Sequence, residues 1–376
     1  MRRLAAWLGA GVIGLAAAGC SEPVDQAAQC LGEPLDRPML VLESDRSSSS
    51  ALGFLTTDGC FTETADVSLG ADPSLSLSRG RAFVCARDQG VVLEVDAASK
   101  SITNVFVSYT DGEVPPNPHD VAVDAAGRLW IARYSSPSVG IVLHDGSWGG
   151  SIDLSALGGA DGIPDMEAIT AAGDRVFIAL ERLNADYKAE GPGLVAVIPA
   201  APPFAIETSF EIGAQNPFGR LVPAPWDATG STVAVAAPGE IDTTSDANTN
   251  GVVLLSLESV QAKLAISEAA LGGSPLEIAL AGPSEAYAIV GGPVPGVNPT
   301  SVVAWDPETG AVTRTLAGPA EGFVHAGLAV NGPYVVVGDH TFGAPRIRFF
   351  DRTSGAEVFS ITPKLLPPIA LLTLSP

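Results

Sequence analysis

Six ionisable side chains lie at or near the start of apolar segments that are widely separated along the chain. They are His119, Asp120, Glu167, Arg220, Glu277 and His325. Imidazole and carboxylate groups ligate metal ions and transfer protons near neutral pH. If the fold gathers these segments, two interpretations are open: a metal or general-base site, or an exposed polar rim satisfied by water and by its own members. The pattern favours the rim and a binding role, and we assign no catalytic residue.

Residues with side-chain oxygen atoms, which could ligate a metal ion, occupy alternate positions near the end of the segment 238–251. Asp246, Asn248 and Asn250 precede Gly251, a spacing that resembles the first three ligand positions of a calcium loop. The rest of the motif is missing, because Leu257 stands where an EF-hand has its bidentate glutamate. A polar turn is therefore favoured over a calcium site, and no other cofactor is expected.

A repeated unit must position these side chains. Seven apolar segments start at intervals of 45 to 58 residues, at Pro73, Pro118, Pro164, Pro217, Pro275, Phe323 and Pro368. Further apolar runs of four to eight residues follow each start, and this length favours strands over helices. Four antiparallel strands in each unit of about 40–50 residues is the signature of a β-propeller blade.

The two ends of the chain complement each other. The segment 368–374 has the pattern of a first strand with nothing after it, whereas three strands near 39–43, 51–57 and 60–69 have no first strand before them. Pairing these segments would complete a seventh blade and remove the exposed strand edges at the junction. We therefore predict an all-β fold, in which residues 39–376 form one seven-bladed β-propeller closed by its own C-terminal strand.

The segment 118–132 combines Pro-x-x-Val-Ala-Val with Gly-x-Leu-Trp-Ile-Ala. This pattern resembles bacterial seven-bladed propellers of the YVTN, NHL and SMP-30 type, over about residues 39–376 and at the level of the fold. In SMP-30-like lactonases, Glu, Asn and Asp residues hold a central divalent metal. The resemblance gives Glu167 and Glu277 roughly similar positions, but the asparagine ligands have no counterpart. It leaves a metal-dependent hydrolase or lactonase as the alternative to a binding or scaffold protein.

The N-terminus carries the features of an export signal. Arg2 and Arg3 precede an apolar run at residues 4–18, which is too short to span a bilayer comfortably. The run ends in Leu-Ala-Ala-Ala-Gly-Cys20, which resembles the lipobox of bacterial lipoproteins. The resemblance implies a signal peptide at 1–19, acylation of Cys20 with palmitate-like chains, and a lipidated tether at 20–38. An ordinary secretory signal with an unmodified Cys20 is the alternative.

The residue after Cys20 indicates the membrane to which a lipoprotein is sorted. Ser21 in this position, rather than Asp, resembles outer-membrane sorting. We therefore expect an exported chain held at the cell envelope by its lipid alone, at the outer membrane. The formal net charge of -22 disfavours nucleic acid and anionic lipid surfaces as partners. An envelope protein, a glycan or a small ligand remains, and we expect a monomer.

Three cysteines remain after Cys20. An exported compartment permits a disulfide, and three thiols allow one bridge with one thiol left over. Cys30 with Cys60 is the favoured pair, which leaves Cys85 as a buried thiol between apolar neighbours. A bridge between Cys60 and Cys85 is the alternative.

Overall fold

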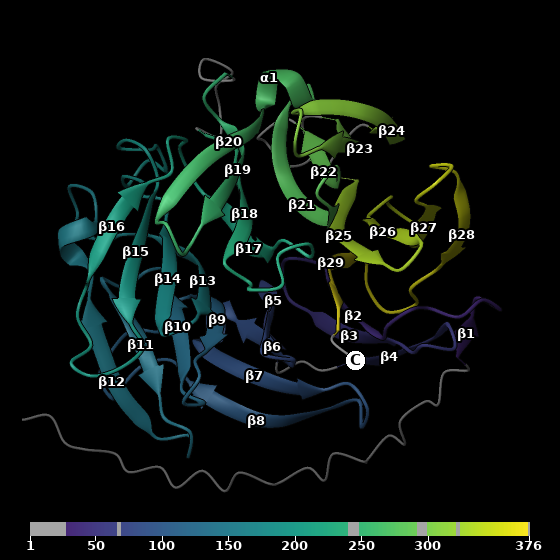
Figure 1. Cartoon of the computed structure of the whole chain (residues 1–376). Coiled ribbons are helices and arrows are strands. Elements are labelled where there is room, and N and C mark those ends of the chain that lie inside the picture. The colour runs from purple at the N-terminus through teal and green to yellow at the C-terminus, as the bar shows by residue number, and fades with distance from the viewer. Residues whose placement is uncertain (1–27, 66–68, 240–247, 292–298, 321–323, 375–376) are drawn as a thin grey trace, which may run out of the picture.

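The strands form seven antiparallel sheets arranged as blades around a central channel (Figure 1). The computed structural model describes residues 28–65, 69–239, 248–291, 299–320 and 324–374. The predicted seven-bladed propeller is confirmed. Helical structure in these residues includes α1 (Glu268–Leu271) and single 3₁₀ turns at Arg87–Gln89 and Ser155–Leu157. Within the described ranges, no helix has the length and apolar character needed to cross a membrane.

Each blade has four strands, numbered outward from the channel. The innermost strands are β5 (Pro73–Ser78), β9 (Pro118–Val123), β13 (Met166–Ala172), β17 (Phe218–Pro223), β21 (Ser274–Gly282), β25 (His325–Asn331) and β29 (Pro368–Thr373). The second strands are β6 (Arg81–Ala86), β10 (Leu129–Arg133), β14 (Arg175–Leu180), β18 (Thr232–Ala237), β22 (Glu285–Gly291), β26 (Tyr334–Asp339) and β2 (Met39–Ser44). The third strands are β7 (Val91–Asp96), β11 (Ser138–Val142), β15 (Leu194–Pro199), β19 (Gly251–Ser256), β23 (Thr300–Asp306), β27 (Arg346–Asp351) and β3 (Ser50–Leu55). The outer strands are β8 (Ser101–Val107), β12 (Trp148–Asp153), β16 (Thr208–Glu211), β20 (Gln261–Ser267), β24 (Ala311–Ala320), β28 (Glu357–Ile361) and β4 (Cys60–Ala65).

The core lies between the blades. Each of seven buried apolar clusters in the described residues joins two neighbouring blades. On β14, Ile178 packs with Trp130 of the preceding blade, whereas the adjacent Phe177 packs with Val235 of the following blade. Successive side chains of a strand point to opposite faces of its sheet, so a blade covered on both faces needs a continuous apolar run. This explains why the strands lack polar alternation.

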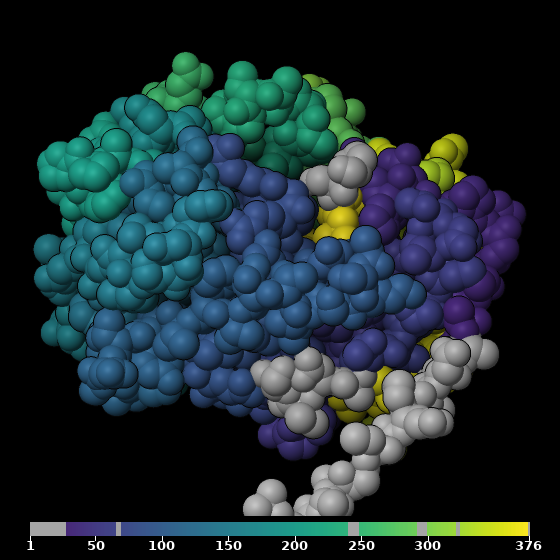
Figure 2. Space-filling view, turned by 90° about the horizontal axis from the view of Figure 1, so that it is seen from below, coloured from purple at the N-terminus to yellow at the C-terminus, as the bar shows by residue number. Residues whose placement is uncertain are grey.

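The C-terminal strand closes the ring as predicted. β29 pairs antiparallel with β2, with Leu371 opposite Val41. Ile369, Leu372 and Leu374 join the cluster shared with the blade of β5, whereas Leu371 joins the cluster shared with the blade of β25. In Figure 2, yellow C-terminal atoms lie beside purple N-terminal atoms. The last strand therefore holds three sheets together.

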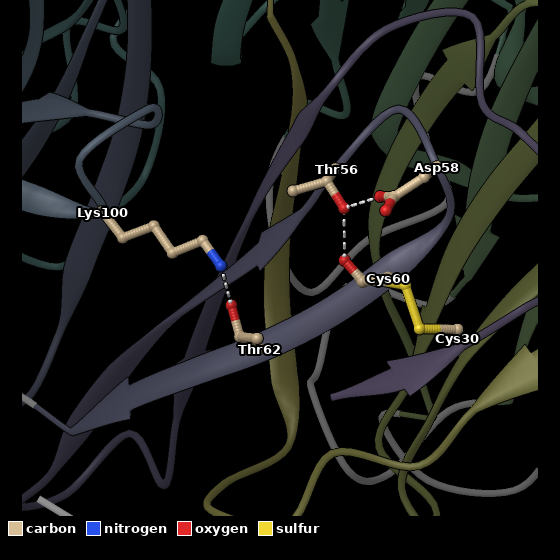
Figure 3. Close-up of a disulfide and its surroundings, with 6 residues drawn as sticks. All are labelled: Cys30, Thr56, Asp58, Cys60, Thr62 and Lys100. Carbon is tan, nitrogen blue, oxygen red and sulfur yellow. Dashed lines mark hydrogen bonds between the residues drawn. A yellow bond between two sulfur atoms is a disulfide. The ribbon is translucent and has the colours of Figure 1, made fainter. Parts of the chain in front are cut away.

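Residues 28–38 belong to the folded ring, which corrects their assignment to the tether. β1 (Gln29–Cys30) pairs with the outer edge of β4, and Leu35 is buried. Cys30 is bonded to Cys60 (Figure 3), and Cys85 is a buried free thiol. An outer strand such as β4 has a free edge that can pair with one more strand. The pairing of β1 with this edge attaches the chain to the ring before β2 begins.

One side of the ring gathers two kinds of loop. Segments that lead into the inner strands lie on the side that also carries the loops joining second to third strands. Backbone bonds connect the two kinds of segment, for example Tyr134 N–H to Asn117 O, Glu181 N–H to Asp165 O, and His340 N–H to Val324 O. We call this side the upper face and the opposite side the lower face.

Closure of the ring can be tested at Leu371, which is 1% exposed. Leu371→Ala should lower the free energy of unfolding by about 2–5 kcal/mol, because it leaves a cavity between β29 and the neighbouring blade. Val358→Ala on the outer strand β28, where the side chain is 47% exposed, should change it by less than about 0.5 kcal/mol. Urea unfolding of both variants gives the comparison. Equal effects would contradict the closing role of β29.

Candidate functional site

The channel contains two cavities, and we call their shared lining the waist. The upper cavity, about 390 Å³, lies where the inner strands begin, and the lower cavity, about 440 Å³, lies where they end. Arg220, Val222, Ile278 and Leu371 line both cavities and so mark the waist.

The lining of the upper cavity is mostly apolar. Apolar residues from five inner strands and their neighbours include Leu75, Phe218, Leu276, Ile278, Ile289, Ala326, Ile369 and Leu371. The polar residues are Arg46, Asp72, Ser74, Arg87, Glu167, Asn216, Arg220, Glu277 and His325. An apolar hollow with a few convergent polar groups is typical of a small-molecule site.

Three buried or half-buried carboxylates each fasten one inner strand to the next, at three of the junctions between blades. Asp120 on β9 accepts the N–H of Ile169 on β13 at 2.9 Å. Glu167 on β13 accepts the N–H of Gly219 on β17 at 2.7 Å. Glu277 on β21 accepts the N–H of Gly327 on β25 at 3.0 Å. A buried backbone N–H that lacks a strand partner needs another acceptor, and these acids provide it.

The two glycines in these contacts have a specific conformation. Gly219 and Gly327 have φ of 76° and 84°, in the left-handed region that glycine adopts without strain. Both lie where the pairing register of the inner strand shifts. A bulge releases an N–H from the strand ladder, so the freed N–H groups turn toward the carboxylates of the preceding blade.

Glu167 also anchors a hydrogen-bonded network below the loops of the upper face. His119 Nδ1–H donates to Oε2 of Glu167, and an Arg87 Nη2–H donates to His119 Nε2. This arrangement selects the neutral imidazole, because one ring nitrogen donates while the other accepts. Burial lowers the pKa of His119, and Arg87 adds to that shift against the opposing charge of Glu167. Burial opposes ionisation of Glu167, but the imidazole, Arg87 and the Gly219 N–H together hold its pKa below the ordinary value.

Two further acids lie behind this network. Tyr134 stacks on His119 with ring centroids 4.1 Å apart, and its hydroxyl donates to Glu181 at 2.7 Å. Burial, followed by the charge of Glu167, raises the pKa of Glu181 well above its ordinary value. Burial raises the pKa of Asp165 to about 6. Neighbouring acids are thus shifted in opposite directions, since the pKa of Glu167 is lowered while that of Glu181 is raised.

His325 is buried on the opposite side of the upper cavity. Its side chain is 1% exposed, and Nδ1 lies 3.0 Å from the Thr300 hydroxyl. The same hydroxyl oxygen accepts the backbone N–H of His325 at 3.2 Å. The Thr300 hydroxyl thus contacts both the backbone N–H and the ring of His325. Burial lowers the pKa of His325 and so disfavours its charged form.

The six predicted rim residues do gather around the channel, but Asp120, Glu167 and His325 are buried and the other three are half-buried. Glu167, Arg220, Glu277 and His325 line the upper cavity, Asp120 lines the lower one, and His119 lies behind Glu167. The expected exposed rim is wrong: the exposed fractions of Asp120 and Glu167 are 6% and 8%. Packing of one blade against the next removes these side chains from water, which a single blade's sequence cannot show.

No cluster of three or more His, Cys, Asp or Glu side chains suited to a metal ion occurs in the described ranges. In the calcium-like segment, Asp246 lies outside the described residues. Asn248 is exposed, and Asn250 is buried with Oδ1 accepting the N–H of Gln215 at 2.9 Å. In the described part of this segment, the side chain of Asn250 thus has a structural contact with the backbone.

Sequence reasoning missed Tyr134, Phe218, Asn216 and Arg46 as parts of the site. Their signals were weak, because each lies at or near the end of a strand without any motif of its own. One usable signal was Gly219, since an isolated glycine inside a strand pattern suggests a bulge.

No protein-family model and no curated protein sequence matches the chain. Solved structures do resemble it. Dihydro-heme d1 dehydrogenase NirN is 15% identical, with a TM-score of 0.55 over 91% of this chain and 76% of that one. BamB from Moraxella catarrhalis is 11% identical, with a TM-score of 0.50 over 90% and 88%. A streptogramin B lyase is 10% identical, with a TM-score of 0.50 over 79% and 86%. At such identities the likeness shows the propeller fold alone.

Glu167→Ala tests whether the buried acids hold the ring together. The change leaves the Gly219 N–H and the His119 N–H without their acceptor, so the free energy of unfolding should fall by about 2–5 kcal/mol. Glu211→Ala on the outer strand β16, where the side chain is exposed, should have an effect below about 0.5 kcal/mol. Urea unfolding at pH 7 measures both. An unchanged stability in Glu167→Ala would mean that this carboxylate does not fasten β13 to β17.

Proposed function

We propose that this chain is a non-enzymatic binding lipoprotein of the bacterial cell envelope, which holds a small, partly apolar ligand in the upper cavity. The observation that carries the proposal is the form of that cavity. It encloses about 390 Å³ at the mouth of the channel, and apolar side chains from several blades line it. Preformed hollows of this size and lining bind small molecules in many proteins.

The hydrogen bonding of the acids favours binding over catalysis. A carboxylate that accepts hydrogen bonds from the protein is a weaker base than a free one, because those bonds stabilise its ionised form. Both oxygens of Glu167 accept bonds from other residues of the ring, and Oε1 of Glu277 accepts the Gly327 N–H. These contacts suit a rigid wall that shapes the cavity, and a rigid cavity binds with little loss of conformational entropy.

The expected anchor is compatible with an open upper face. Cys20 precedes Ala28, the first described residue, by eight positions, and β1 runs along the outer edge of the blade closed by β29. Eight residues span at most about 29 Å when fully extended. A lipid at Cys20 would therefore hold the ring by its side and close to the membrane, and the upper cavity would stay accessible.

Cys20→Ser tests the anchor. Without the thiol, acylation should be abolished, and the protein should no longer incorporate radiolabelled palmitate or resist extraction from the membrane fraction. Two or three acyl chains on one residue give stable anchoring, so the loss should be nearly complete. A Cys20→Ser chain that still fractionates with membranes would contradict lipid anchoring.

Ala370→Trp tests binding in the upper cavity. Ala370 on β29 is part of the lining, so an indole there should fill the hollow. Isothermal titration with decanol, a neutral apolar probe, should show binding to the mature chain with Cys20→Ser, and Ala370→Trp should weaken it by about tenfold or more. Ala311→Trp on the exposed outer strand β24 should bind as the parent does.

Two outcomes would count against this proposal. Absence of decanol binding, or equal binding by Ala370→Trp, would place the ligand elsewhere. A fall in melting temperature on addition of EDTA that disappears in the double variant Glu167→Ala, Glu277→Ala would instead favour the metal-dependent hydrolase, because a bound ion stabilises the folded state.

A further inference from the structure

A wide bulge in β17 directs one cationic side chain into the waist of the channel. Phe218 pairs with Ala236, and Val222 pairs with Ala234. The three residues between them on β17 therefore face only Val235 on β18. Bulges re-aim side chains and are common beside functional sites. Arg220 lies in the middle of this bulge and lines both cavities.

The Arg220 guanidinium has spare hydrogen-bonding capacity. Within the described ranges it forms no ion pair, and its one hydrogen bond, from Nη2 to the carbonyl oxygen of Leu371, measures 3.5 Å. A guanidinium has five N–H donors, and good bonds to oxygen are about 2.7–3.2 Å long. Two other arginines of the channel are paired: Arg87 lies 3.3 Å from Asp72, and Arg352 lies 2.5 Å from Glu285.

Asp120 and Glu277 interact with this guanidinium through charge, but in the described ranges neither is hydrogen-bonded to it. Asp120 already accepts bonds from the Ser76 hydroxyl and from the N–H groups of Val121 and Ile169. Glu277 accepts the Gly327 N–H, and burial raises its pKa.

The geometry points to an amphiphilic anion as the ligand: we propose that a carboxylate or phosphate head group lies against Arg220 at the waist while a hydrocarbon chain occupies the upper cavity. The inference rests on the proposed function and names its ligand class. A planar guanidinium binds a carboxylate or phosphate through two parallel bonds. The apolar body would lie beside Phe218, Leu276 and Ile369, which line the same cavity.

Isothermal titration of the mature chain with Cys20→Ser tests this, with decanoate, decyl phosphate and decanol as probes. At least one of the two anions, decanoate or decyl phosphate, should bind with an affinity at least about tenfold higher than that of decanol. The reason is that hydrogen bonds to charged groups are stronger than those to neutral groups. Arg220→Gln should abolish that preference and leave decanol binding within about twofold. Arg175→Gln, on an outer face where Arg175 pairs with the half-exposed Glu207, should keep it.

The outcomes separate the two proposals. Equal binding of the anions and decanol by the parent chain, or a preference that persists in Arg220→Gln, would overturn the anion inference and leave the cavity as an apolar site. Failure of all three probes to bind would overturn both. If Arg220→Gln does not fold, Arg220→Lys provides the comparison: it keeps the charge but loses the paired bonds, so the anion preference should fall without disappearing. An undiminished preference there would contradict paired recognition by the guanidinium.

Discussion

Contact between neighbouring blades is the interaction on which the whole structure depends. Each sheet is apolar on both faces, and the buried clusters lie between sheets instead of inside them. A blade by itself would leave two apolar faces in water, so no blade is stable without both of its neighbours. Only a closed ring satisfies this condition for all blades, and closure requires the first and last parts of the chain to share a sheet.

The same condition explains why the channel acids are structural. Inner strands converge toward the channel, and their bulges free backbone N–H groups in places that water reaches poorly. Asp120, Glu167 and Glu277 accept those N–H groups across the gap between blades. A buried carboxylate is costly unless hydrogen bonds compensate for lost water, and here each acid and each freed N–H satisfies the other.

A ring held in this way leaves a rigid hollow at its centre. The walls are inner strands fixed on both sides, so the cavity does not have to form when a ligand arrives. Its polar groups are neutral or paired at most positions, as in the His119, Glu167 and Arg87 network. Arg220 differs, because its bulge places it at the waist with one long bond. This contrast makes the waist the part of the channel most able to select a ligand.

Much of the fold could be predicted from the sequence, because it depends on local patterns. Starts at Pro73 and Pro118 recur with nearly constant spacing, and each precedes short apolar runs of strand length. The unpaired strand patterns at the two ends of the chain indicate closure by themselves. The six channel residues could also be placed near the channel, since they follow the starts of the repeat.

What those residues do was decided by the tertiary structure alone. His119 contacts Arg87, Tyr134 and Glu167. These three residues lie 15 to 48 positions away from His119 in the sequence and belong to other strands or loops. Burial of Glu167, the neutral state of His119 and the direction of Arg220 all follow from the packing of one blade on the next. A strand pattern records which face of a sheet is apolar, but the desolvation and hydrogen bonding of a polar group depend on atoms contributed by other blades.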